Sequence, residues 1–297
     1  MIARALPVPN RRSAIAVAVA GALVLLLAVA PAASASWFRP EHDGGSPNAN
    51  DISTLFTIVL VVGVLIFLLV EGLLIYSIIK FRRKRGGPEP AMVHGNTPLE
   101  VGWTIGATVI VAALAAVTFV FLPSIKNPPN SGSNGLQQLA GIKFASLKQP
   151  NPPNGRALRI NVVGQQYIWR FDYISATPRL TESRPVFSYF EMVVPTNTTV
   201  VLQINSSDVA HSWWIPKLGG KADAIPGHNN YTWFKISKPG IYTGQCAELC
   251  GNNHADMRAQ VRAVPPDEFT AWLSQQRQDI LNSQQQLAAQ RKAGEGS

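Results

Sequence analysis

Cysteine is scarce in this chain: two of the 297 residues are cysteines, Cys246 and Cys250, and they lie four positions apart. No Cys-x-x-Cys-His sequence is present, which excludes a covalently attached c-type haem on this chain. Acidic residues are also few, 17 against 26 Lys and Arg, so the net charge is +9. This excess does not indicate nucleic-acid binding, because the 17 basic and 11 acidic residues from position 123 onward are spread thinly.

The first 35 residues have the pattern of a secretory signal peptide. Arg4, Arg11 and Arg12 precede an apolar run at 14–30, and Ala-Ser-Ala follows at 33–35. A basic start, an apolar middle and small residues at the exit predict cleavage after residue 35. An uncleaved anchor is the alternative, because the apolar run is long for a signal.

Two further apolar segments, at 52–79 and 101–122, are each long enough to cross a hydrocarbon layer about 30 Å thick as a helix. Five basic residues crowd into positions 80–85, so the connecting loop at 80–98 is expected in the cytoplasm. Residues 36–122 are therefore predicted to form a transmembrane hairpin in contact with lipid. The chain is expected to be a multi-pass protein of a bacterial-type plasma membrane, with its remaining domain on the extracytoplasmic side.

Residues 123–156 are rich in Pro, Asn, Gly and Ser and are predicted to form a linker. The sequence after them consists of short β-type runs separated by Gly, Pro and Asn turns, which predicts an all-β Greek-key sandwich or barrel. The predicted strands are 158–163, 166–173, 189–194, 198–205, 211–215, 231–236, 240–245 and 258–264.

A helix is expected to start at Pro265, because Pro and acidic residues occupy its first turn. The external domain is therefore predicted to span 157–274, and residues 275–297 are predicted to fray into a polar tail.

The two cysteines belong to a short segment that is rich in soft metal ligands. Cys246 and Cys250 are followed by His254 and Met257, so two thiolates, an imidazole and a thioether lie within twelve residues. Soft sulfur ligands beside an imidazole suit copper, and a weak thioether ligand is typical of copper sites that transfer electrons. Because two thiolates can bridge a pair of ions, the segment indicates a site for two copper ions.

Two other uses of the cysteines fit the sequence less well than copper does. A disulfide is favoured outside the cytoplasm, but a bridge between residues four apart would close almost no chain and stabilise little. Structural zinc sites rarely use methionine. A further imidazole is expected from an earlier strand, and His211, among aromatic and β-branched neighbours, is the best candidate. His228 lies in a Pro-Gly-His turn and is expected to be solvated.

The segments around these ligands resemble subunit II of cytochrome c oxidase. The resemblance rests on Asp-Val-Ala-His-Ser-Trp at 208–213, Lys-Ala-Asp-Ala-Ile-Pro-Gly at 221–227 and Gly-Gln-Cys-Ala-Glu-Leu-Cys-Gly at 244–251. It implies a cupredoxin-like domain that carries a binuclear copper centre called CuA. The implied ligands are His211, Cys246, Glu248 through its backbone carbonyl, Cys250, His254 and Met257. The resemblance also implies a magnesium ion at the interface with subunit I, bound by the carboxylate of Glu248.

The resemblance assigns two further roles. The family's electron-entry segment falls on 164–173, where Tyr167 occupies the position of the usual tryptophan and Trp169 follows two residues later. Glu100, at the start of the second span, matches an acid at the mouth of a proton-uptake path shared with subunit I. The alternative for Glu100 is a carboxylate that stabilises a helix start.

These features predict the electron-input subunit of a proton-translocating cytochrome c oxidase, with subunits I and III and a cytochrome c as partners and no nucleic acid. The two spans contain no histidine, so haem ligands and oxygen reduction are expected on another subunit. The basic external domain favours a cytochrome c that is weakly basic or tethered to the membrane. The alternatives are a membrane-anchored copper carrier and a quinol-oxidase-type subunit II, although the latter lacks the copper ligands.

Overall fold

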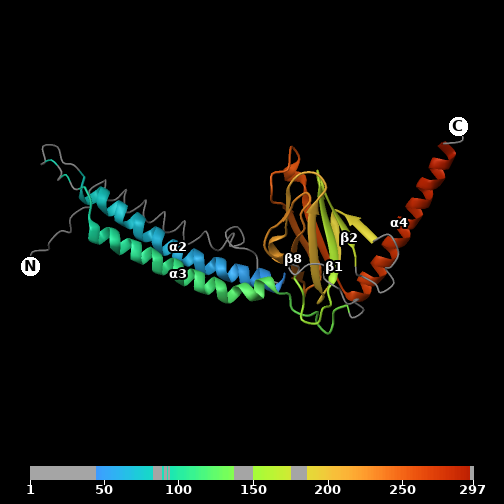
Figure 1. Cartoon of the computed structure of the whole chain (residues 1–297), viewed down its shortest axis with the longest axis horizontal. Coiled ribbons are helices and arrows are strands. Elements are labelled where there is room, and N and C mark those ends of the chain that lie inside the picture. Colours follow the sequence, from blue (N-terminus) through green and yellow to red (C-terminus); the bar gives the residue numbers. More distant parts are fainter. Residues whose placement is uncertain are drawn as a thin grey trace, which may run out of the picture. The chain divides into compact units, whose positions relative to one another are not determined.

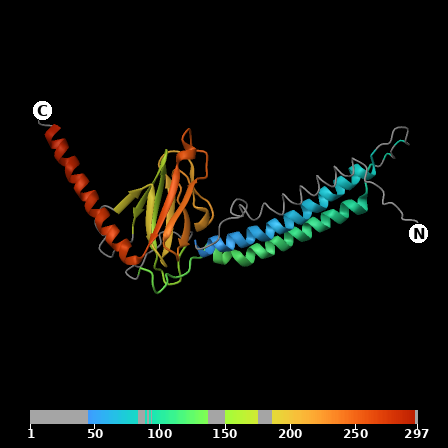
Figure 2. The ribbon, with the colours of Figure 1, turned by 180° about the vertical axis from the view of Figure 1, so that it is seen from behind.

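The computed structural model describes residues 45–82, 89, 92, 94–136, 150–174 and 186–294. The predicted signal peptide and residues 83–88, 90, 91 and 93 of the predicted cytoplasmic loop lie outside these residues. Two long helices come first, α2 (Pro47–Lys80) and α3 (Thr97–Lys126), and they run side by side in both views (Figures 1 and 2). Both are long and apolar enough to cross a membrane. They extend the predicted spans at both ends.

Most side chains of α2 and α3 are exposed rather than packed inside the chain. Large apolar residues such as Leu65, Ile79 and Phe119 are more than half exposed, and no residue of α3, as described, is buried. Such a surface is unstable in water, because exposed apolar area costs free energy. The two helices therefore need lipid or other membrane helices around them.

Two five-stranded sheets follow the helices. The first has the order β3-β2-β1-β5-β8 and consists of β1 (Leu158–Gln165), β2 (Ile168–Tyr173), β3 (Val186–Tyr189), β5 (Thr199–Ser206) and β8 (Asn230–Lys235). The second has the order β4-β10-β9-β6-β7 and consists of β4 (Glu191–Pro195), β6 (His211–Trp214), β7 (Ala222–Ala224), β9 (Gly240–Cys246) and β10 (Arg258–Val264).

Most neighbouring strands are antiparallel, but β1 pairs with β5 and β4 pairs with β10 in parallel. The predicted hairpin of two membrane helices followed by a β-sandwich is confirmed (Figure 1). The short strand β7 was not predicted, and only the last residue of β3, Tyr189, falls in a predicted run. The chain changes direction at Phe190, whose φ is 67°, so the run predicted at 189–194 contributes to two strands instead of one.

The core lies between the two sheets. Residues of β1 alternate, with Leu158, Ile160 and Val162 fully buried, as expected for strands with one face inward. Tyr173 of β2 is also fully buried, and its hydroxyl donates to the carbonyl of Val193 at 3.0 Å and accepts from the N–H of the same residue at 2.8 Å. Burial raises the pKa of Tyr173, so this hydroxyl keeps its proton.

The last helix, α4 (Pro266–Gly294), packs on the sandwich through Phe269 and Leu273, both buried. The prediction that the chain frays after Gln275 is wrong, because the helix continues without a break to Gly294 (Figure 1). The segment is rich in Gln, Ala, Leu and Arg, which have high helix propensity. In addition, the Gln275 amide donates to the Asp279 carboxylate one turn later, at 2.9 Å.

The described part of the predicted linker is fixed to the sandwich by hydrogen bonds. Its first four residues, 123–126, complete α3. The hydroxyl of Thr199 donates to the carbonyl of Pro129 at 2.6 Å, and the N–H of Gly132 donates to the carbonyl of Asn197 at 2.7 Å. Residues 127–136 are therefore part of the folded domain rather than a free tether.

Candidate metal centre

The predicted ligands come from two neighbouring strands of the second sheet, β6 and β9, and from the segment between β9 and β10. His211 is the first residue of β6 and Cys246 is the last residue of β9. These strands are paired, with Trp213 opposite Cys246. Cys250 lies in the loop after β9, and His254 begins a short 3-10 helix, η2 (His254–Asp256), that leads through Met257 into β10.

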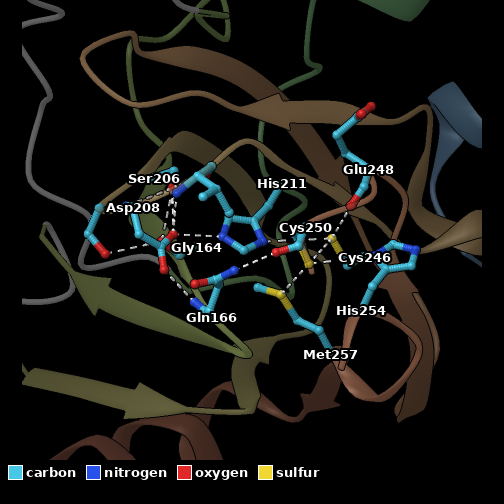
Figure 3. Close-up of polar contacts among 12 residues, drawn as sticks. Gly164, Gln166, Ser206, Asp208, His211, Cys246, Glu248, Cys250, His254 and Met257 are labelled. Atoms are coloured by element: carbon cyan, nitrogen blue, oxygen red, sulfur yellow. Dashed lines mark hydrogen bonds and ion pairs between the residues drawn. The ribbon is translucent and has the colours of Figure 1, made fainter. Parts of the chain in front are cut away.

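The structure brings all six predicted ligand groups together around the two sulfur atoms (Figure 3). The Sγ atoms of Cys246 and Cys250 are 3.9 Å apart. The remaining distances are His211 Nδ1 to Cys246 Sγ 3.9 Å, Glu248 O to Cys246 Sγ 3.3 Å, His254 Nδ1 to Cys250 Sγ 3.6 Å and Met257 Sδ to Cys250 Sγ 3.9 Å. Each thiol therefore has one imidazole and one weaker donor beside it.

The donor set fits a pair of soft metal ions better than a disulfide. Both cysteines are free, and their sulfurs are far beyond the roughly 2.05 Å of an S–S bond. Metal–thiolate bonds are about 2.3 Å long, and 3.9 Å is less than twice that length. The two sulfurs are therefore close enough together to bind the same metal ion. Two thiolates, two imidazoles and a thioether are ligands that favour copper.

The site is closed on one side and reaches the surface on the other. His211 and Met257 have no exposed surface, and Cys246 and Cys250 are 2% and 5% exposed. His254 is half-buried, and the Glu248 side chain is exposed and points away from the sulfurs (Figure 3). The Glu248 carboxylate is therefore available to a group outside this chain, while its carbonyl faces Cys246.

Burial and the neighbouring Cys246 raise the pKa of the Cys250 thiol to about 11. Both effects disfavour a second negative charge in a small apolar space. In the metal-free chain at neutral pH this thiol therefore keeps its proton. A metal ion that binds Cys250 must displace the proton.

Asp208 orients the imidazole of His211. Its Oδ1 lies 2.9 Å from His211 Nε2, which leaves Nδ1 directed at Cys246. Burial acts to raise the pKa of Asp208, but hydrogen bonds from the backbone of Gln166, the His211 ring and the backbone of Val209 outweigh it and lower the pKa to about 2. Carboxylates in this position fix the tautomer of metal-binding histidines. Asp208 is the first residue of the 208–213 motif, but the sequence alone does not indicate this role.

The other predicted site residues lie in different environments. Tyr167 is half-buried and its hydroxyl covers Gly251, where an added Cβ would lie 2.5 Å from it. Trp169 packs edge-on against His211, with ring centroids 5.8 Å apart, and has no exposed surface. Trp169 therefore lies behind the metal site rather than at the surface, and its part in electron entry stays a prediction. Glu100 lies in the first turn of α3, and its Oε1 accepts the N–H of Asn96 at 3.2 Å, so it stabilises this helix start.

The fold and this site define a class: a β-sandwich protein with a sulfur-rich candidate metal site and two membrane-type helices. The family described as cytochrome c oxidase subunit II, periplasmic domain, matches residues 158–264, and the corresponding transmembrane domain matches residues 35–121. Cytochrome c oxidase subunit 2 of Cereibacter sphaeroides is 34% identical over 259 residues, which cover 80% of this chain and 82% of the relative. The chain belongs to the cytochrome c oxidase subunit II family.

Two further relatives show how far the similarity extends. Cytochrome c oxidase subunit 2 of Alkalihalophilus pseudofirmus is 31% identical over 84% of this chain, and the match spans 65% of that relative's length. The crystal structure of the periplasmic domain of subunit II of cytochrome oxidase from Bradyrhizobium japonicum is 34% identical, with a TM-score of 0.37. It covers 41% of this chain and 94% of the other.

Proposed function

We propose that this chain is the electron-input subunit of a cytochrome c oxidase. It accepts single electrons from a cytochrome c on the extracytoplasmic side and delivers them to haem in subunit I, where oxygen is reduced and protons are translocated. Family membership supports the assignment, and one observation carries it: two free thiols 3.9 Å apart, each with an imidazole beside it.

The chain's residues would hold two copper ions in distinct ways. Cys246 and Cys250 would be shared by both ions, while His211 and His254 would each bind one. Met257 and the carbonyl of Glu248 would be the weak ligands. The bound pair supplies a centre that gains and loses one electron. The paired strands β6, β9 and β10 hold the ligands in place, so the geometry changes little between redox states.

The surroundings of the site suggest how the partners bind. Tyr167 is partly exposed beside the loop that carries Cys250, and it would contact the donor cytochrome. The buried ring of Trp169 packs against the ring of His211. The exposed Glu248 carboxylate would bind magnesium at the interface with subunit I. The apolar surfaces of α2 and α3 would pack against lipid and against subunits I and III.

Ligand burial favours this function over the two alternatives. A copper carrier needs ligands that can exchange metal with a partner, but His211 and Met257 have no exposed surface. A quinol-oxidase-type subunit would not need thiols and imidazoles arranged together.

Oxygen consumption by the assembled oxidase tests the proposal. His254→Asn removes one imidazole, and His228→Asn is the matched control, since His228 is exposed in the turn before β8. We expect His254→Asn to lose most of the turnover with reduced cytochrome c, while the haem spectrum of the complex persists. His228→Asn is expected to keep the wild-type turnover. Full turnover in His254→Asn would reject the proposal.

A further inference from the structure

We propose that Gln166 is a positioning residue of the metal centre, although it is not a ligand. Its side chain holds the carbonyl of Cys250, and its backbone holds Asp208, the carboxylate that orients His211. The inference rests on the proposed copper site. It adds that one residue of the turn between β1 and β2 fixes the position of His211 relative to the loop that carries Cys250.

The first contact is made by the Gln166 side chain. Its Nε2 donates to the carbonyl oxygen of Cys250 at 2.6 Å. Cys250 lies outside the strands, since β9 ends at Cys246 and β10 begins at Arg258, so no sheet ladder fixes its backbone. The Gln166 amide is therefore a direct restraint on the loop that carries the second thiol.

The turn that contains Gln166 lies tightly over this loop. Gly251 has a φ of 133°, a conformation that residues with side chains rarely adopt. A Cβ at Gly251 would also lie 2.9 Å from Gln166 Nε2 and 2.5 Å from the Tyr167 hydroxyl. Glycine at this position lets the Gln166 amide approach the Cys250 carbonyl closely.

The second contact is made by the Gln166 backbone. Its N–H donates to Asp208 Oδ2 at 2.7 Å, while the other oxygen of the same carboxylate lies 2.9 Å from His211 Nε2 (Figure 3). Gln166 therefore connects the strand that supplies His211 with the loop that supplies Cys250. Because Cys250 Sγ lies within 3.9 Å of three other donor atoms, a shift of its backbone changes the whole cluster.

The side-chain contact can be removed without disturbing the backbone contact. Gln166→Met has a similar length but no donor, and Gln166→Glu places a carboxylate oxygen against the Cys250 carbonyl. Gln165→Met and Gln165→Glu are the matched controls, because Gln165 is the exposed preceding residue and its side chain bonds no residue of the ligand loop. The protein is the full-length chain in detergent, loaded with copper.

Three measurements are needed: copper per chain, the rate at which a copper chelator removes the metal, and the electron paramagnetic resonance spectrum. We expect Gln166→Met to lose copper about tenfold faster than wild type, the lower end of the effect of removing a residue that supports a metal ligand. Gln166→Glu is expected to lose it faster still, and both spectra should change. The Gln165 variants are expected to match wild type, and the metal-free melting temperature should stay similar in all variants.

The outcomes separate the two proposals. If wild type does not bind a copper pair, the proposed function fails. If wild type binds the pair and the Gln166 variants release it at the rate of the Gln165 controls with unchanged spectra, the positioning role is overturned. A fall in the metal-free melting temperature that accounts for the faster copper loss would also overturn it, since Gln166 would then be a general stabilising residue.

Discussion

The sulfur atoms of Cys246 and Cys250 lie 3.9 Å apart although the two residues sit on different kinds of backbone. Cys246 is held in β9 by pairing with β6, whereas Cys250 lies in the loop that follows. The spacing of the thiols therefore depends on how well the loop is fixed. The hydrogen bond from the Gln166 side chain to the Cys250 carbonyl provides that restraint.

Copper affinity is expected to depend on pH. Since the pKa of the Cys250 thiol is about 11, this thiol is protonated between pH 6 and pH 8 in the metal-free chain. Each proton displaced by copper makes the apparent affinity rise about tenfold per pH unit. Competition with a chelator of known pH dependence measures this slope, and Cys250→Ser should reduce it. An affinity that is constant across this range would contradict the prediction.

The buried hydroxyl of Tyr173 is expected to stabilise the sandwich. Tyr173→Phe leaves the carbonyl and the N–H of Val193 without this partner in the core, which should lower the free energy of unfolding by about 1–3 kcal/mol. Tyr189→Phe is the control, because Tyr189 is 47% exposed. Denaturant unfolding followed by near-ultraviolet circular dichroism compares the two. Equal stabilities would show that this hydroxyl contributes nothing measurable.

Tyr167 is expected to serve electron entry. Tyr167→Ala should reduce turnover with cytochrome c by about fivefold, the effect of losing an aromatic contact worth about 1 kcal/mol. Copper content should stay at the wild-type level, because Tyr167 supplies no metal ligand and its side chain takes no part in the hydrogen bond from Gln166 to Cys250. Steady-state oxygen consumption at several cytochrome c concentrations tests this, with exposed Tyr189→Ala as the control. Unchanged kinetics would dismiss the role.

Glu100 is expected to take part in proton uptake in addition to stabilising the start of α3. Glu100→Gln retains an oxygen that can accept the Asn96 N–H, so helix capping is preserved while proton exchange is lost. We expect slower turnover by Glu100→Gln, with an unchanged copper spectrum, and a similar loss in Glu100→Ala. If Glu100→Gln behaves as wild type across pH and only Glu100→Ala is impaired, Glu100 only stabilises the start of α3 and takes no part in proton uptake.

Features set by local sequence were predicted well. The candidate ligands from Cys246 to Met257 lie within twelve residues, so the sequence already indicates that they are close together; that they bind metal stays a prediction. The two long helices follow from long apolar segments, of which the first contains a single ionisable residue, Glu71. The extension of α4 was missed because a polar composition was taken to indicate fraying, although Gln and Ala favour helices.

Features set by packing could not be predicted. The electron-entry segment does not show in sequence which of its residues are exposed, and alternation along β2 places Trp169 in the core. Likewise, the hydrogen bond from Gln166 to Cys250 joins residues 84 positions apart, so only the folded sandwich brings them together.

The metal content of the full-length chain tests the central claim most directly. After reduction and reconstitution with copper, we expect two copper ions per chain. We also expect an electron paramagnetic resonance spectrum from one unpaired electron shared by both nuclei. One copper with a single-nucleus spectrum, a preference for zinc, or a bond between Cys246 and Cys250 under these conditions would contradict it.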